Sequence, residues 1–174
     1  MNSIDKKTLK FINAVKANLI NTAKKLLNEG VCVNATDGNM NVALAYVKSV
    51  EMLKVLLDNG ANINAKNREM DSVLTVFVKR MDRVKWNLTQ FPEMSPIELS
   101  KIWDVIKKRG VDTTAVNLDN KKAKYYVDMN DPAQRAIGAK ICVHEGHMRM
   151  KQGEERRAAM KSLNLETSKL GNGK

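Results

Sequence analysis

The sequence predicts an all-α fold: a helical repeat solenoid of helix-turn-helix units joined by short hairpin loops, with a helical C-terminal extension. Residues 26–35 and 56–65, thirty positions apart, share the pattern Leu-Leu-x-x-Gly-x-x-Val/Ile-Asn-Ala. Self-similarity at a period of about 20 to 50 residues is typical of repeat architectures, in which each unit buries its apolar face by stacking on its neighbours. Glycines at positions 30, 60 and 110 each follow an apolar helical pattern, where a C-cap glycine is expected.

Residues 5–130 divide into four units. Apolar residues at helical spacing from Leu9 to Leu27 predict two short antiparallel helices in the first unit, with a break near Asn18. Together these units form the predicted repeat domain, and their boundaries are 5–30, 31–60, 61–110 and, for a partial fourth unit, 111–130.

The third unit is split by an insertion at residues 81–95. Its first helix includes the apolar residues 74–78, and its second begins at Ser95-Pro96-Ile97-Glu98, where serine caps, proline takes the first helical position and glutamate closes a capping box. The insertion is either a tolerated surface extension or a segment whose Trp86 and Phe91 pack on the third unit or anchor a partner.

Two segments resemble the ankyrin repeat family. Gly60-Ala61-Asn62-Ile63-Asn64-Ala65, after a Leu-Leu pair, is similar to the end of an ankyrin repeat, and Asp37-Gly38-Asn39-Met40-Asn41-Val42-Ala43-Leu44-Ala45 resembles the family's Asp-Gly-x-Thr-Pro-Leu-His-x-Ala. Residues 50–57 resemble its second helix. The resemblance covers residues 5–80 well and weakens towards residue 112. It implies an ankyrin-like stack that binds proteins, and the alternative is a generic helical bundle with coincidental glycine caps.

A helical basic extension is predicted for residues 131–163. Asp131-Pro132-Ala133-Gln134 has the pattern of a helix start, and the apolar residues between Ala136 and Val143 give the helix one apolar side. Lys and Arg then alternate with Glu, and residues 164–174 have the composition of a disordered tail. The charged run is either a solvated helix face or a phosphate-binding element with steep salt dependence.

Composition and charge are typical of a small folded domain that binds an acidic surface. The formal net charge is +11, which favours attraction to nucleic acid, an anionic membrane surface or an acidic protein face. Cys32 and Cys142 have no spacing typical of a disulfide framework, and no apolar run is long enough to span a bilayer. We expect a monomer in the cytoplasm. If the source is an intracellular bacterium or a virus, this would be the cytoplasm of a host cell into which the protein is delivered.

No pattern in the chain predicts catalysis. Cys142-Val143-His144-Glu145-Gly146-His147 has atoms that could bind zinc or copper, but its histidines are three residues apart rather than at metalloprotease spacing. Phosphate loops, nucleophile elbows and kinase signatures are absent from the sequence. We therefore expect no enzyme activity, no catalytic residues, no cofactor and no metal, although a metal-linked enzyme fragment is a third, weaker hypothesis.

The leading functional hypothesis is a protein-protein interaction module or adaptor that binds through hairpin tips and first helices. Tyr46 and Arg68 are the predicted energetic anchors, because Tyr and Arg are enriched among hot spots. The alternative is a basic protein that binds nucleic acid or an anionic surface through its C-terminal extension. Carried over from the family by position, the predicted partner-binding residues are Thr36, Asp37, Asn39, Tyr46, Val47, Lys48, Lys66, Asn67, Arg68 and Glu69.

Overall fold

The fold is helical throughout the part of the chain that the computed structural model describes, residues 5–82 and 94–171, with side chains described up to residue 162. This confirms the predicted all-α class. The elements in chain order are α1 (Lys6–Lys16), α2 (Ile20–Asn28), the 3-10 helix η1 (Ala43–Tyr46), α3 (Val50–Asp58), α4 (Val73–Lys79), the 3-10 helix η2 (Arg80–Asp82), α5 (Pro96–Lys108), the 3-10 helix η3 (Ala123–Tyr126) and α6 (Pro132–Gly171).

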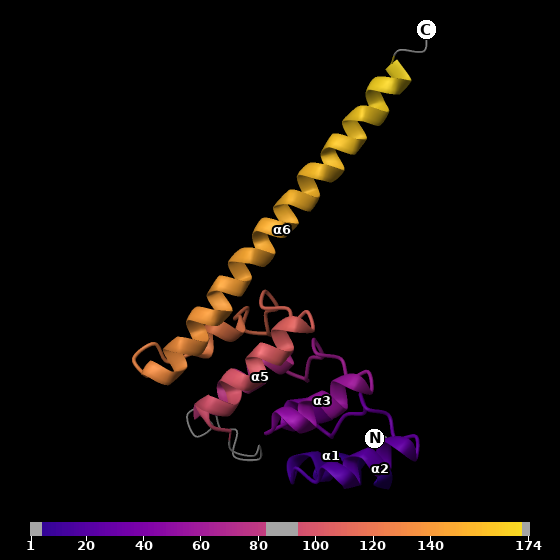
Figure 1. Cartoon of the computed structure of the whole chain (residues 1–174), viewed down its shortest axis with the longest axis vertical. Coiled ribbons are helices and arrows are strands. Elements are labelled where there is room, and N and C mark those ends of the chain that lie inside the picture. Colours follow the sequence, from indigo (N-terminus) through magenta and orange to yellow (C-terminus); the bar gives the residue numbers. More distant parts are fainter. Residues whose placement is uncertain (1–4, 83–93, 172–174) are drawn as a thin grey trace.

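The helices form two layers, in which each element packs on its counterparts in neighbouring units. One layer runs through α1, η1, α4 and η3, and the other through α2, α3, α5 and the start of α6 (Figure 1). Each unit contributes one first helix and one second helix, so each covers an apolar face that its neighbour would otherwise leave in water. We call α1 to η3 together with α6 up to Glu145 the repeat stack, and residues 146–171 the projecting segment.

Glycines end three of the second helices, as the sequence predicts. Gly30, Gly60 and Gly110 have φ angles of 86°, 84° and 79°. This left-handed conformation is easily reached only without a Cβ atom, and it turns the chain out of the helix into the next hairpin. Asn18 takes a φ of 57° between α1 and α2, at the predicted break.

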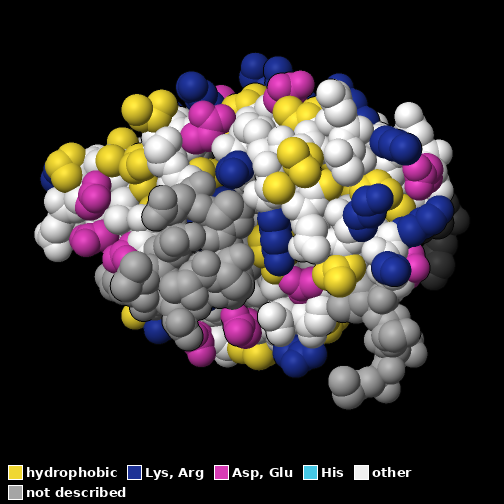
Figure 2. Space-filling model, turned by 90° about the horizontal axis from the view of Figure 1, so that it is seen from below, with side chains coloured by type: hydrophobic (Ala, Val, Ile, Leu, Met, Phe, Trp, Pro, Cys, Tyr) yellow, Lys and Arg dark blue, Asp and Glu magenta, His cyan; other side chains and the backbone are white. Residues whose placement is uncertain are grey.

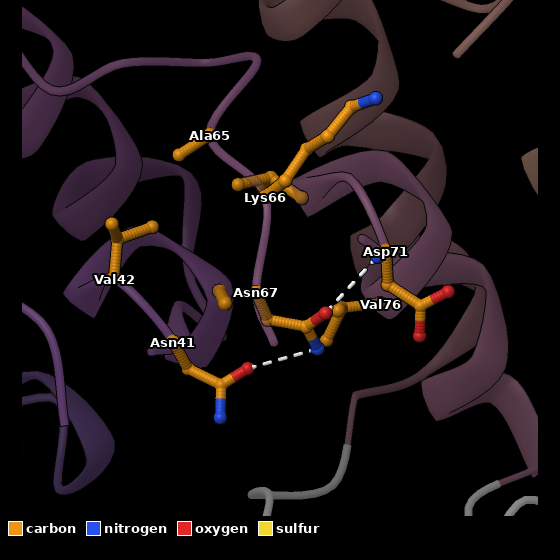
Figure 3. Close-up of a pocket in the computed structure, with 9 residues that line it drawn as sticks. Asn41, Val42, Ala65, Lys66, Asn67, Asp71 and Val76 are labelled. Carbon is orange, nitrogen blue, oxygen red and sulfur yellow. Dashed lines mark hydrogen bonds between the residues drawn. The ribbon is translucent and has the colours of Figure 1, made fainter. Parts of the chain in front are cut away.

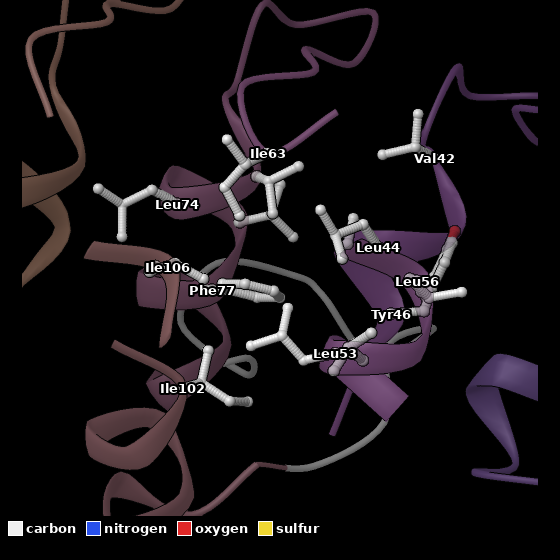
Figure 4. Close-up of a cluster of buried hydrophobic side chains, with 14 of the residues drawn as sticks. Val42, Leu44, Tyr46, Leu53, Leu56, Ile63, Leu74, Phe77, Ile102 and Ile106 are labelled. Atoms are coloured by element: carbon white, nitrogen blue, oxygen red, sulfur yellow. The ribbon is translucent and has the colours of Figure 1, made fainter. Parts of the chain in front are cut away.

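The core is continuous from the first unit to the last and lies between the two layers. Phe77 of α4 is fully buried among Leu53 of α3 and Ile102 and Ile106 of α5, so side chains from two units meet around one ring (Figure 4). Because the chain has few aromatic residues, aliphatic side chains provide most of this buried surface.

The start of α5 confirms one predicted interaction and corrects another. Ser95 caps the helix, with its Oγ accepting a hydrogen bond from the Glu98 amide at 3.1 Å. Glu98 does not act as the second half of a capping box but reaches the preceding unit, where its Oε1 accepts from the Val50 amide at 3.2 Å. A carboxylate at the N-terminus of α3 satisfies a free amide and complements the helix dipole, so it joins two units.

α6 begins at the predicted helix start and runs beyond the predicted extension. Its first turns lie beside α5 in the second layer. The helix continues to Gly171, past the predicted end near residue 163, because no proline or left-handed glycine interrupts it after Pro132. Gly146 and Gly153 both lie inside the helix.

Trp86 and Phe91 of the insertion lie outside the described residues. None of the described helices has the length and apolar character that crossing a membrane requires.

Candidate partner-binding surface

Three hairpins of identical design run along one edge of the repeat stack. Each is closed by a single antiparallel bridge, and the bridged pairs are Thr36 with Val42, Lys66 with Ser72, and Val116 with Lys122. Near the end of each hairpin, one residue has a left-handed backbone. These residues are Met40, Met70 and Asn120, with φ angles of 61°, 61° and 57°. We call residues 38–40, 68–70 and 118–120 the hairpin tips.

A short polar side chain organises each hairpin from within. In the second hairpin, Asn67 Oδ1 accepts hydrogen bonds from the amides of Glu69 and Asp71, both at 3.0 Å. Asp37 accepts the equivalent bonds in the first hairpin and Asn117 in the third. Side-chain acceptors that bond amides two and four residues ahead hold a tight turn, which explains why Asp and Asn recur at this position.

Hydrogen bonds between hairpins hold the tips in a fixed row. The Arg68 amide donates to the Asn39 carbonyl at 3.3 Å, and the Leu118 amide donates to the Glu69 carbonyl at 3.1 Å. Arg68 adds a side-chain bond from Nη2 to the Gly38 carbonyl at 3.0 Å. The same contact therefore repeats from one tip to the next, and the tips cannot move independently.

A second set of hydrogen bonds, which we call the asparagine ladder, joins the units at the ends of their second helices. Asn34 Nδ2 donates to the Gly60 carbonyl at 3.0 Å, and its Oδ1 accepts from the Asn62 amide at 2.7 Å. Asn64 makes the same two bonds one unit later, to the Gly110 carbonyl and from the Asp112 amide. These are the asparagines of the repeated Asn-Ala dipeptide, so the sequence echo marks residues that join consecutive units.

Between the first and second hairpins, the structure closes around a space too small for a ligand. Asn67 donates from Nδ2 to Asn41 Oδ1 at 3.2 Å across this gap, and Val42 and Val76 line its apolar side (Figure 3). The enclosed volume is about 10 Å³, which is at the lower limit for one water molecule. This gap serves packing between units and not small-molecule binding.

The structure corrects the predicted role of two residues on the first helix of the second unit. Tyr46 is 1% exposed and Val47 is fully buried, so neither can contact a partner. The Tyr46 hydroxyl donates to Asp37 Oδ2, and Lys16 Nζ lies 4.0 Å from the ring centroid. Burial and the bond to Asp37 raise the pKa of Tyr46 well above its ordinary range. Tyr46 therefore holds the first hairpin against the stack.

The other predicted residues lie on or near the hairpins. Asn39, Arg68 and Glu69 are exposed at the tips, whereas Asp37 and Asn67 are turned inward as hairpin organisers. Half-buried Thr36 and exposed Lys66 belong to bridged pairs, and half-buried Lys48 precedes α3.

Exposed apolar side chains at the tips were missed by sequence reasoning. Met40, Met70 and Leu118 are 51%, 42% and 73% exposed, although their backbones are fixed. The signal was present, since Met40 and Met70 occupy the same position thirty residues apart. Large apolar side chains held in water on a rigid row are candidates for partner contact.

A buried ion cluster closes the far end of the stack. Glu145 of α6 is 2% exposed, and its carboxylate meets Lys122, Lys124 and Arg149, the last two at 2.8 and 2.7 Å. Burial alone would raise the pKa of Glu145, but hydrogen bonds and charges from Lys122 and Lys124 outweigh it and lower the pKa to about 2. This cluster fastens α6 to the third hairpin.

The remaining residues of the predicted metal candidate point in different directions around α6. His144 packs edge-on against Trp103 of α5, with ring centroids 5.7 Å apart, while Cys142 is exposed. Within the described residues, no group of three or more His, Cys, Asp or Glu side chains is arranged to hold a metal ion. Cys32 is a free, exposed thiol, as is Cys142.

Comparison with known proteins agrees with this architecture. Residues 42–68, from the first helix of the second unit through the following hairpin, match the family model of the ankyrin repeat. This chain has the ankyrin-repeat fold. Among solved structures, the ankyrin repeat domain of Bcl-3, a member of the IkappaB protein family, is similar with a TM-score of 0.52 and 21% sequence identity. The match covers 67% of this chain and 45% of that chain, and no curated protein matches this ankyrin-repeat chain by sequence.

Proposed function

We propose that this chain is a protein-protein interaction module whose hairpin tips contact the partner. The observation that carries the proposal is the row of exposed apolar side chains, Met40, Met70 and Leu118, held in register by hydrogen bonds between hairpins. Ankyrin repeats are generally protein-interaction modules, and a surface that is already ordered loses little conformational entropy on binding.

Polar side chains beside the row give it the character of an interface. Arg68 and Glu69 are exposed next to Met70, and Asp119 lies next to Leu118. Apolar contacts surrounded by charged groups of both signs are typical of the core and rim of protein interfaces, where Met and Arg are enriched. We therefore keep Arg68 as a predicted anchor and replace Tyr46 by the two methionines.

A paired variant tests this proposal. Full-length protein would capture a binding partner, and the purified partner would then be titrated against the wild type and a Met40→Glu/Met70→Glu double variant. We expect the tip variant to bind at least about tenfold more weakly, because two apolar contacts become charged.

The matched control adds the same charge in the second layer, through Asn21→Glu on α2 and Ile97→Glu on α5, both exposed positions. Its affinity should equal that of the wild type. Equal affinity of the tip variant and the wild type would refute the tips as the binding surface.

A further inference from the structure

One face of α6 carries small and apolar residues, interrupted by Arg157, at alternating spacings of three and four. Such a pattern averages about 3.5 residues per turn, which keeps the side chains in line along one side of a helix, as in helix pairs that wrap around each other. We call this face the outer stripe, and its members are Ala139, Val143, Gly146, Met150, Gly153, Arg157 and Met160.

Most of the outer stripe faces away from the repeat stack, whereas Ala139 and Val143 also border a hollow beside α5. The side of α6 that packs on the stack is marked by the buried residues Ile137, Ile141 and Glu145. The largest apolar members of the stripe, Val143, Met150 and Met160, are 58%, 67% and 66% exposed. Beyond Arg149 the helix extends away from the repeat stack, so most of the stripe lies along the projecting segment (Figure 1).

Two glycines give the outer stripe room for a close neighbour. A Cβ atom at Gly146 or Gly153 would meet nothing within 4 Å. Beside Gly153 the surface of α6 is shallowly hollowed between the side chains of Arg149, Met150, Glu154 and Arg157. A glycine inside a helix lowers helix stability by about 1 kcal/mol relative to alanine. Because helices in proteins gain most of their stability from packing, a second helix against these glycines would stabilise α6. A large side chain from a second helix would fill this hollow.

The charged residues beside the outer stripe indicate which charges a helix bound to it would carry. Arg149 and Arg156 lie along one edge and Lys161 along the other, where Glu154 is the acidic member. A second copy of the chain would bring more of these cations together, against a net charge of +11 on each chain. A helix with acidic flanks would instead pair with them, since charges beside the apolar seam set partner choice.

We propose that the outer stripe of α6 binds an amphipathic helix of another protein whose flanking positions are acidic. This surface is separate from the hairpin tips. On the face seen in Figure 2, Lys and Arg side chains are interspersed with Asp, Glu and hydrophobic ones, so that face does not form a broad phosphate-binding surface.

The test uses full-length protein and two synthetic helical peptides of about four heptads, with leucine at the seam positions. One peptide has glutamate at the flanking positions and the other has lysine. Repulsion between its glutamates limits self-association of the first peptide. Titration by fluorescence anisotropy should show saturable binding of the glutamate peptide and binding at least about tenfold weaker for the lysine peptide.

Matched variants locate the contact on α6. Met150→Glu lies in the outer stripe, and Ala159→Glu adds the same charge at an exposed position on the opposite side of the helix. Met150→Glu should weaken binding of the glutamate peptide at least about tenfold, whereas Ala159→Glu changes it less than about twofold. The Met40→Glu/Met70→Glu variant should bind the peptide like the wild type, which separates this proposal from the function of the tips.

Several results would overturn the proposal. These are equal affinity for the two peptides, no binding of the glutamate peptide, or equal losses in Met150→Glu and Ala159→Glu. A dimer in sedimentation equilibrium that Met150→Glu dissociates would assign the stripe to a second copy. A DNA oligonucleotide that displaces the glutamate peptide and binds more tightly would assign the stripe to phosphate.

Discussion

The repeat stack and the projecting segment of α6 are both helical, but they are stabilised in different ways. In the stack, each unit is joined to the next by buried apolar side chains, by the paired bonds of Asn34 and Asn64, and by bonds between hairpin tips. The projecting segment begins beside the Glu145 cluster and then leaves the stack (Figure 1). Its order depends on local helix propensity, which is weak over two glycines.

This difference shows how one chain can present two kinds of surface. The hairpin tips are fixed before any partner arrives, because bonds from neighbouring units hold them. The outer stripe lies on a segment that gains stability when something packs on it. Changes inside the stack should therefore alter global stability, while changes on the projecting segment should leave it unchanged.

The largest effect is expected from Phe77→Ala. The ring is fully buried between the second and third units, and its removal leaves a cavity that the surrounding helices cannot fill. The free energy of unfolding should fall by about 3 to 5 kcal/mol in urea titrations. Met160→Ala, in the projecting segment, should change it by less than about 0.5 kcal/mol. Comparable losses in the two variants would remove the distinction between the regions.

Glu145→Gln tests the junction between the two regions. Loss of the carboxylate leaves Lys122, Lys124 and Arg149 without their shared partner, which should cost about 1.5 to 3 kcal/mol at pH 7. Since the pKa is lowered from 4.5 to about 2 in the folded protein, this stabilisation is complete above pH 4.5 and is lost as the pH falls towards 2. The difference between wild type and variant should shrink over that range, and a constant difference would contradict it.

Asn64→Ala removes the hydrogen bonds by which Asn64 joins the third unit to the fourth. The substitution removes a donor to the Gly110 carbonyl and an acceptor for the Asp112 amide, both partly accessible to water, and should cost about 1 to 2 kcal/mol. Asn21→Ala, at an exposed position of α2, is the control and should be close to neutral. If both variants unfold at the wild-type denaturant concentration, Asn64 does not join the units.

The smallest effect is a pH dependence at the contact between α5 and α6. Burial, then the charge of Lys107, lowers the pKa of His144, although a hydrogen bond with the Val111 backbone opposes the shift. The stabilisation from neutral His144 is therefore complete above pH 6.5 and is lost as the pH falls below it. His144→Phe should flatten the pH dependence of the free energy of unfolding between pH 7.5 and 5.5. An unchanged slope in His144→Phe would reject this assignment.

The repeated sequence predicted the parts of the fold that are set locally. Gly30, Gly60 and Gly110 end helices because a left-handed residue is needed there, and Ser95 caps α5 because its hydroxyl reaches the helix amides. The predicted ankyrin resemblance is confirmed by the family match and by the fold. Spacing within one unit was enough for these features.

Features that depend on neighbouring units could not be predicted from one sequence. Tyr46 was expected on the binding face, but its hydroxyl is bound to Asp37 and its ring lies under Lys16. Glu98 fits a capping box in sequence, yet bonds the amide of Val50 in another unit. The length of α6 was not predicted, because the composition of residues 164–174 is typical of disorder, yet the helix continues to Gly171.

Native-state hydrogen exchange tests the contrast between the two regions most directly. The amides of Arg68 and Leu118, which bond neighbouring tips, and those around Phe77 in α4 should be protected and should open only with the stack. Amides of residues 150–162 in the projecting segment should exchange orders of magnitude faster in the free protein. Equal protection of the two sets, or greater protection of the projecting segment, would contradict the division of the chain into a preformed stack and a locally stabilised helix.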